Sequence, residues 1–262
     1  AYGCFCTASI ASEIGDTTVA AQMLEYASQW KNAFDQTGLL RDSTYYEGSK
    51  YNYSFRLLHD MAGRISLAGG DTAFVELLDD FFGYAANSVP APGVSPSRAE
   101  MVEGESLGRF EGFNNEPDME SPYAYVYAGR QDRANEVVRA GLNQCYGDSR
   151  GGLVGNDDSG GMSSWYVWSA LGLFPVAGQD VFLIGSPLFD RTELHFGQSR
   201  AFTIEAEGTG AENLYVQSVL LNGKPFQKPF LRWKDLCLGG TLSIKMTSTP
   251  TIWTEERPPS CA

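Results

Sequence analysis

The chain lacks several features that mark particular classes of protein. None of its apolar runs reaches the roughly 18 residues of a membrane-spanning helix, so we expect no membrane segment. Basic residues are few, with 19 Lys and Arg against 32 Asp and Glu, which gives a formal net charge of -13. Nucleic acids and anionic membranes bind basic surfaces, so we expect neither as a partner. Neutral, hydroxyl-rich ligands or cations suit this charge better.

Histidine and cysteine are also scarce. Two His and five scattered Cys leave little for a zinc site. The cysteines favour a secreted protein in an oxidising environment, in which a bridge between Cys237 and Cys261 would close the C-terminal tail. Buried free thiols in a cytosolic protein are the alternative. A glycosylation sequon begins at Asn52, but its apolar surroundings argue that it is not used.

Apolar residues are abundant, at 43% of the chain, and their spacing changes along it. Three- and four-residue spacings dominate the first two thirds, and short alternating runs dominate the last third. We therefore predict a mainly α chain with a β C-terminal part. Because the helices follow one another as loop-connected pairs, residues 1–175 are assigned to part of an α/α toroid. Residues 176–262 are assigned to a C-terminal β-sandwich layer.

Individual helices in the first part have recognisable limits. One is predicted over 17–34, with Asp16 as its N-cap. Apolar residues at helical spacing predict a second from Tyr51 to Met61, and Gly69-Gly70 ends that stretch. Asp71 is expected to cap the next helix. The Pro-, Ser- and Gly-rich segment 87–108 is typical of a long surface loop.

Three oxygen-rich loops each precede a predicted buried helix, over residues 45–48, 114–120 and 155–160. Carboxylates on separate loops meet the requirement of glycoside hydrolysis for one acid and one base or nucleophile. If a metal is bound, oxygen ligands without Cys or His indicate calcium. A structural network of salt bridges is the alternative.

The segment 152–187 combines an acidic loop with an aromatic helix. Asn156, Asp157 and Asp158 lie between glycines, where the backbone can turn sharply and bring several oxygens together. Ser163 or Ser164 can cap the helix that follows, and the apolar surface of that helix, which includes Trp168, is expected to lie in a core. A solvated helix N-terminus is the other interpretation of such a loop.

Several motifs together resemble glycoside hydrolase family 92, the calcium-dependent, inverting, exo-acting α-mannosidases. They are YYEGSKYNYSFRLLHD, NNEPDMESPYAYVYAGR and GNDDSGGMSSWYVWSALGLFPV, the last followed by IGSPLFD. The resemblance covers about residues 17–196. It implies a substrate with terminal α-linked mannose and a calcium cofactor.

The resemblance also implies roles for individual residues. Glu47 matches the general acid, and Asp158, assisted by Asp157, matches the base that activates water. By the same resemblance the substrate-binding residues are Asn156, Glu116 and Asp60. The metal ligands it implies are Asn115 and Glu116.

The chain departs from the family at several positions and in its length, and the helix after Glu47 differs from the common form at Ser49, Lys50 and Asn52. Many members carry an acidic residue where this chain has Asn156, which bears on whether the base is shared. Family members are also much longer, so we expect an N-terminal fragment of the same enzyme as a partner that completes the site. The alternatives are a noncatalytic carbohydrate-binding or scaffold relative and another toroidal glycosidase acting on a different sugar.

Overall fold

The computed structural model describes residues 1–41, 50–84, 113, 115–155, 157–197 and 200–261. Its helical part contains the following α-helices and 3-10 helices: α1 (Tyr2–Glu13), α2 (Thr17–Ser28), η1 (Gln29–Ala33), α3 (Lys50–Ser54), α4 (Met61–Leu67), α5 (Asp71–Phe81), η3 (Glu116–Asp118), η4 (Ser121–Tyr123), α7 (Ala124–Tyr127), α8 (Gln131–Gln144), η5 (Asp158–Gly160) and α9 (Gly161–Ala170). The predicted loop over 87–108 lies outside the described residues.

The rest of the described chain is mostly β. Its elements are β1 (Leu173–Pro175), β2 (Phe182–Ile184), β3 (Arg191–Phe196), β4 (Arg200–Glu207), β5 (Tyr215–Leu221), β6 (Lys224–Pro225), β7 (Phe230–Leu231), the short helix α10 (Trp233–Cys237) and β8 (Gly240–Thr247). One sheet has the order β1-β2-β7 and is antiparallel. The other has the order β3-β4-β8-β5-β6, in which only the β4–β8 pair is parallel. A mainly α chain with a β C-terminal part is therefore confirmed.

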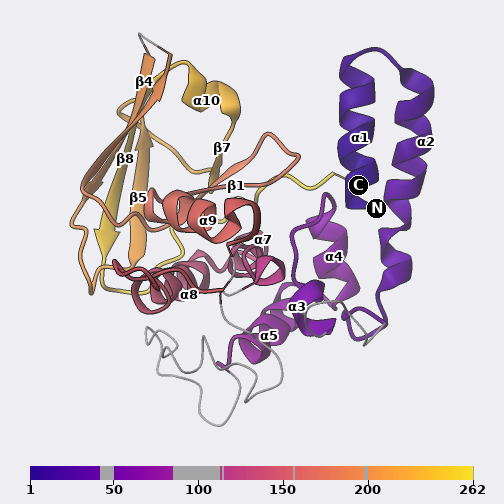
Figure 1. Cartoon of the computed structure of the whole chain (residues 1–262), viewed down its shortest axis with the longest axis horizontal. Coiled ribbons are helices and arrows are strands. Elements are labelled where there is room, and N and C mark those ends of the chain that lie inside the picture. The colour runs from indigo at the N-terminus through magenta and orange to yellow at the C-terminus, as the bar shows by residue number, and fades with distance from the viewer. Residues whose placement is uncertain (42–49, 85–112, 114, 156, 198–199, 262) are drawn as a thin grey trace.

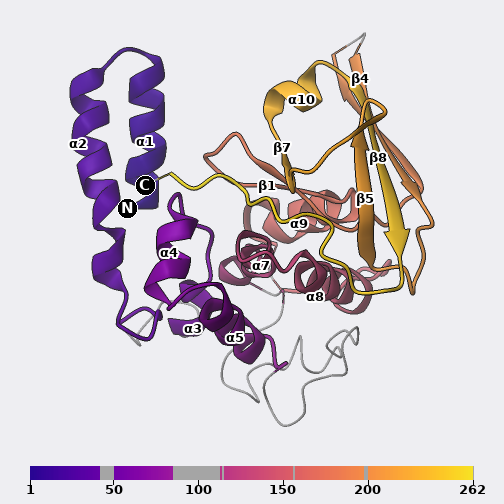
Figure 2. The ribbon, with the colours of Figure 1, turned by 180° about the vertical axis from the view of Figure 1, so that it is seen from behind.

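Figure 1 shows the α1–α2 hairpin at one end of the molecule and the strands at the other, with α7, α8 and α9 between them. The C-terminal segment runs back from β8 past α8 and α7 to the hairpin, as Figure 2 shows from behind. Gln131 donates a hydrogen bond to the Thr254 carbonyl (3.1 Å), and the N–H of Cys261 donates to the His59 carbonyl (2.7 Å). These contacts fix the segment along the helical part.

The helix predicted from Tyr51 to Met61 is instead broken into α3 and α4. The break has partners for its backbone, because the Glu120 carboxylate accepts the Leu57 N–H (3.0 Å) and Asp60 accepts the Gly63 N–H (2.8 Å) as N-cap of α4. Side chains can thus replace the hydrogen bonds of a continuous helix. The Asp16 cap of α2 is confirmed, since its carboxylate accepts the Val19 N–H at 3.0 Å.

Two further helix starts differ from expectation. The 12 residues of α1 form a helix that the sequence analysis did not predict. Gly70, with φ of 99°, occupies the N-cap position of α5, and Asp71 is the first helical residue. Glycine adopts this positive φ without the steric cost that a side chain would add.

The helix α8 is buried on nearly all sides although it is rich in charged residues. Its Glu136 side chain accepts hydrogen bonds from the Tyr84 and Tyr215 hydroxyls (both 2.7 Å) and from Arg133 (3.0 Å). Tyr215 belongs to β5, so this buried carboxylate joins the helices to the larger sheet. Such burial is tolerated because each charge has a partner.

Apolar side chains form two clusters, one among the helices and one among the strands. The second includes Leu173 and Leu231 from the three-stranded sheet and Phe202 and Ile244 from the five-stranded sheet. The two sheets therefore share a core. The predicted division into two domains between residues 175 and 176 stays a prediction.

The cysteines do not form the predicted bridge. All five are free thiols. Cys237 is the last residue of α10, which lies beside the strands, whereas the N–H of Cys261 donates to His59 and the C-terminal end of the chain lies by the α1–α2 hairpin. Among the described residues, no helix is long and apolar enough to cross a membrane. Asn52 is 1% exposed and donates to Asp118 (3.0 Å), which keeps its amide away from a glycosylating enzyme in the folded protein.

Candidate active site

The acidic loop before α9 has an unusual backbone. Asp157 and Ser159 have φ values of 51° and 54°, and Gly160 has 72°. Residues other than glycine rarely adopt a positive φ, and clusters of such residues are common at functional sites. Two of the residues predicted to catalyse the reaction, Asp157 and Asp158, lie in this loop. Asp158 is exposed.

Gly160 occupies the N-cap position of α9, and the Asp157 side chain binds to the first turn of that helix. Its carboxylate accepts the Ser163 N–H (2.8 Å) and the Ser163 hydroxyl (2.7 Å), which corrects the expectation that a serine would be the capping residue. These hydrogen bonds, the hydroxyl first, hold the pKa of Asp157 below its ordinary value. Asp157 is therefore kept ionised at the positive end of the helix dipole.

The segment 115–118 approaches the same helix N-terminus. Asn115 caps η3 by accepting the Glu116 N–H through its side chain (3.0 Å). The Glu116 side chain lies against α9, because a Cβ placed on Gly161 would be 3.5 Å from the Glu116 Cγ and 3.6 Å from its Oε1. This Oε1 is buried and has no hydrogen-bond partner among the described residues. An unsatisfied carboxylate oxygen beside a helix N-terminus is suited to receive a ligand's donor group or a cation.

A pocket of about 270 Å³ opens at this place. Its polar lining includes Glu116, Glu120, Arg56 and Ser164, and its apolar lining is given by Met119, Trp165, Trp168, Phe174, Pro175 and Gly161. Trp165 is fixed by a hydrogen bond from its indole N–H to the Met119 carbonyl (2.9 Å). Carboxylates at one edge of an aromatic surface can bind the hydroxyls of a sugar while the rings contact its C–H face.

Buried polar contacts hold the pocket wall in place. Asp118 is fully buried and accepts hydrogen bonds from Asn52 on α3. Glu120 accepts the Leu57 N–H (3.0 Å) and lies 3.5 Å from the Arg56 guanidinium. The wall therefore depends on residues more than sixty positions apart in the chain.

The structure brings some predicted site residues together and separates another. Glu116 lines the pocket, and the Asp157–Asp158 loop leads directly into α9, which forms part of it. Asp60 is not among the residues that line this pocket; besides capping α4 it accepts a hydrogen bond from Ser260 (3.1 Å). Its predicted role in substrate binding stays a prediction. Glu47 and Asn156 lie outside the described residues.

Sequence reasoning missed Trp168, Glu120 and Arg56 as pocket residues. Trp168 had been expected in a core because of its helical spacing, but it is only partly buried and lines the pocket. Glu120 was noted among the oxygens of its loop, yet no local pattern distinguishes it from Asp118, which is buried. Whether Glu120 or Asp118 lines the pocket depends on where each side chain lies relative to α9.

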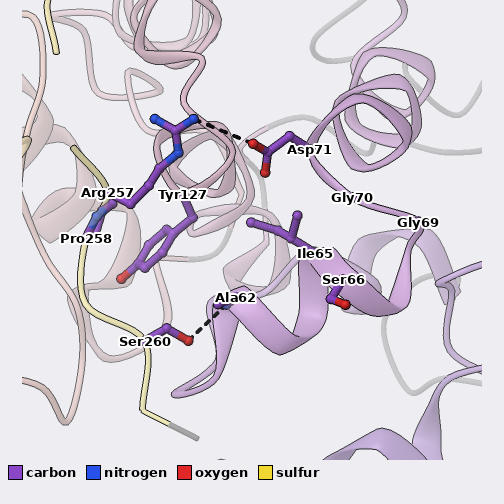
Figure 3. Close-up of a pocket in the computed structure, with 10 residues that line it drawn as sticks. All are labelled: Ala62, Ile65, Ser66, Gly69, Gly70, Asp71, Tyr127, Arg257, Pro258 and Ser260. Carbon is purple, nitrogen blue, oxygen red and sulfur yellow. Dashed lines mark hydrogen bonds and ion pairs between the residues drawn. The ribbon is translucent and has the colours of Figure 1, made fainter. Parts of the chain in front are cut away.

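A larger pocket of about 660 Å³ lies between α4, the start of α5 and the C-terminal segment (Figure 3). Arg257 lies 3.6 Å from the Asp71 carboxylate, and Ser260 accepts the Ala62 N–H (2.9 Å). The buried Tyr127 hydroxyl has no hydrogen-bond partner among the described residues. Asp71 is the single carboxylate among the lining residues, so they lack the pair that glycoside hydrolysis requires.

The model of the glycosyl hydrolase family 92 catalytic domain matches residues 40–248. The chain belongs to glycosyl hydrolase family 92. The match includes all the predicted site residues, and it establishes the chain as part of a glycoside hydrolase family.

Individual relatives agree with this family 92 assignment. An uncharacterized secreted glycosidase of Arthroderma benhamiae is 28% identical over 211 residues, which are 79% of this chain and 24% of that protein. A family GH92 inverting mannosidase of Bacteroides thetaiotaomicron is 27% identical, with a TM-score of 0.82, over 99% of this chain and 38% of that one. A family GH92 alpha-mannosidase of the same bacterium, in complex with mannoimidazole, shares the fold with a TM-score of 0.83, at 24% identity over 99% of this chain and 37% of that one. The chain thus spans about a quarter to two fifths of the length of these relatives.

The oxygen atoms at this site meet the requirements of calcium only in part. Calcium takes six to eight oxygen ligands at roughly 2.3–2.6 Å. Glu116 offers an unsatisfied buried oxygen, whereas the Asn115 side-chain oxygen and both Asp157 oxygens already accept hydrogen bonds. Across the residues that the structure describes, no group of three or more His, Cys, Asp and Glu side chains gathers for a metal. These residues fit one position of a calcium shell and do not form the whole shell.

Proposed function

We propose that this family 92 chain is part of an inverting, exo-acting α-mannosidase that hydrolyses terminal α-mannosides of glycans. The observation that carries the proposal is the pocket at the N-terminus of α9. There the Glu116 carboxylate and the rings of Trp165 and Trp168 adjoin the loop that holds Asp158. One of the relatives with this fold is named an inverting mannosidase, which favours the same stereochemistry here.

In the proposed reaction Glu47 protonates the glycosidic oxygen as the bond between that oxygen and the anomeric carbon breaks, so that the rest of the glycan departs as an alcohol. Asp158 removes a proton from water, which attacks the anomeric carbon from the opposite face. A single displacement of this kind needs the two carboxyl groups about 6.5–9.5 Å apart so that water fits between base and sugar. Asp158 is suited to this role because it is exposed, while its neighbour Asp157 is engaged by Ser163. Asn156 and Glu116 would bind the sugar hydroxyls.

The decisive experiment follows hydrolysis of an aryl α-mannoside by NMR. We expect the β-anomer of mannose to form first, since inversion exchanges the configuration at the anomeric carbon. A first-formed α-anomer would exclude the single displacement. Turnover should be measured in the complete enzyme, because the chain covers only part of its relatives' length.

Calcium remains the cofactor that we propose, with Glu116 as one ligand. The support is its unsatisfied buried oxygen, in a pocket whose described lining residues include no Cys or His. When bound, calcium would supply a positive charge that orients sugar hydroxyls. We assign no reaction step to it. Loss of activity after chelation, restored by calcium and not by zinc, is the expected result.

We also propose that an N-terminal portion of the enzyme packs on the helices to complete an α/α toroid, with the two sheets as its C-terminal sandwich. The support is the shorter length of this chain and the exposure of several large apolar side chains on the α1–α2 hairpin, namely Ile10, Ile14, Leu24 and Tyr26. Such a partner should copurify. A monomeric, cooperatively melting and active preparation of the 262 residues alone would refute this part.

Secretion is proposed on the description of the Arthroderma relative as secreted. A tagged full-length protein should appear in the culture medium, and retention inside the cells would count against it.

The second candidate function is a noncatalytic carbohydrate-binding or scaffold protein with the same fold. It is favoured by the structural use of Asp157, whose carboxylate oxygens both accept hydrogen bonds from Ser163. Binding of mannosides without turnover by the complete protein would support it. Hydrolysis that is lost in Asp158→Asn would exclude it.

A further inference from the structure

A row of partly exposed aromatic rings leads away from the candidate active-site pocket. The ring centroids are 6.0 Å apart between Trp168 and Phe182, 6.4 Å between Phe182 and Trp233, and 5.3 Å between Trp233 and Phe196. Trp168 lines the pocket, so the row begins there. Trp233 is 50% exposed, and the other three side chains are half-buried. The four residues are called the aromatic row below.

The strand register explains how the aromatic row is built. Pro175 of the pocket wall pairs with Phe182 on β2, and Phe182 pairs with Leu231 on β7. Phe182 is the member of the row on this three-stranded sheet, and Trp168, Phe182 and Phe196 also pack against the buried cluster among the strands. The row therefore follows the edge of that cluster from the pocket toward α10. Helix α10 begins at Trp233, two residues after Leu231. The row is therefore continuous with the pocket and does not consist of unrelated exposed rings.

Trp233 is held in position although half of its surface is exposed. Its backbone N–H donates to the Asp180 carboxylate. The preceding Arg232 donates its N–H to Asp235 in a capping box (2.8 Å) and its guanidinium to the Asp180 carbonyl (2.9 Å). A tryptophan fixed in this way loses little further freedom when it binds a ligand. An exposed ring of this kind is typical of a recognition surface.

The chemistry of the aromatic row selects a carbohydrate. Flat rings favour ligands that combine an apolar C–H face with polar edges, and the net charge of -13 disfavours anionic ligands. The occupant is decided by continuity with the pocket: a ligand chain whose end lies against Trp168 would pass over Phe182 and reach Trp233. Asp180 and Arg232 stand beside Trp233 as hydrogen-bonding groups.

We propose that the aromatic row binds the sugar residues that follow the terminal residue of an oligosaccharide held in the pocket. This inference rests on the proposed function, because it takes the terminal sugar to lie beside Glu116. It assigns the enzyme a preference for oligosaccharides over monosaccharide glycosides. Phe196 marks the far end of the bound segment.

The test compares the affinity of the complete enzyme for methyl α-mannoside with its affinity for an α-linked mannotriose. Both are measured by isothermal titration calorimetry in the Asp158→Asn background, in which hydrolysis is expected to be lost. The advantage of the trisaccharide should fall about fivefold in Trp233→Ala, which is the effect of losing one stacking contact. Trp233→Phe keeps a ring and should retain most of the advantage. Ile252→Ala is the control, because Ile252 is also 50% exposed but lies in the C-terminal segment, outside the aromatic row. Circular dichroism checks that each variant is folded.

Three results would overturn the inference. They are equal affinity for the two ligands in the unaltered protein, an unchanged trisaccharide advantage in Trp233→Ala, and an equal loss in Ile252→Ala. Turnover of an aryl α-mannoside, which has no further sugars, tests the proposed function separately. If the aryl substrate is hydrolysed while Trp233→Ala has no effect, the aromatic row alone is refuted. If trisaccharide binding depends on Trp233 but nothing is hydrolysed, the catalytic proposal fails and the binding surface stands.

Discussion

The buried Glu136 carboxylate allows a quantitative test of how the sheet is joined to the helices. Tyr215 on β5 donates its hydroxyl to Glu136 at 2.7 Å, and Glu136 is 1% exposed. Tyr215→Phe removes this one hydrogen bond and leaves the ring in place. A hydrogen bond to a charged group contributes about 1.5–3 kcal/mol, so we expect the free energy of unfolding to fall by about 2 kcal/mol. This corresponds to about 4–8 °C in the melting temperature.

The measurement is urea denaturation of the purified protein, followed by circular dichroism. Tyr26→Phe is the control, since Tyr26 is 50% exposed and such surface changes stay within about 0.5 kcal/mol. Tyr84→Phe removes the hydrogen bond to the other oxygen of the same carboxylate (2.7 Å). Because the two tyrosines share an acceptor, the double variant should deviate from additivity by about 0.5 kcal/mol or more. A loss below about 0.5 kcal/mol in Tyr215→Phe would refute the reasoning.

The remaining predictions concern the site. Asp157 has a lowered pKa in the folded protein, so its contribution to stability is present above its ordinary pKa of about 3.9 and is lost as the pH falls through the folded value. Between pH 6 and pH 3 the melting temperature should therefore fall less steeply with pH for Asp157→Asn than for the unaltered protein. An equal fall in melting temperature for the two proteins would contradict this. Glu47→Gln should nearly abolish turnover of substrates with poor leaving groups and spare activated aryl mannosides, which do not need protonation; equal losses would remove Glu47 from the acid role. Asp158→Asn should reduce both classes alike, because water must be activated whatever departs. Trp168→Ala should raise the KM for mannosides, with Ile252→Ala as control, and an unchanged KM would place substrate elsewhere than this pocket.

Much of the local structure follows from the sequence because its causes are local. Asp16 caps α2 as its position predicts, and the change from helical to alternating spacing marks the passage from helices to strands. The glycines around Asp157 and Asp158 predict a sharp turn, which the positive φ values confirm. The motifs of this loop and of the Glu116 segment also predict the family, because a family resemblance depends only on which motifs occur and in what order along the chain.

Helix breaks and caps could not be predicted in the same way. The helical spacing from Tyr51 to Met61 continues through a break, because Glu120, distant in sequence, supplies a hydrogen-bond acceptor to the Leu57 N–H. Asp157 accepts a hydrogen bond from the first turn of α9, because a turn brings it back to Ser163, six residues later. Each outcome depends on a competing acceptor that the local pattern does not contain.

The sequence by itself determined the family, the main classes of secondary structure and the acidic loops on which chemistry was expected. Tertiary structure decided which oxygens and rings share a pocket. Trp165 and Trp168 lie three residues apart on one helix, yet the first is 2% exposed and the second contributes to a surface that extends to Trp233. Helical periodicity gives the face of a side chain but not what packs against that face. That depends here on β1 and β2, which fold back beside α9 and leave Trp168 partly exposed at the start of the aromatic row.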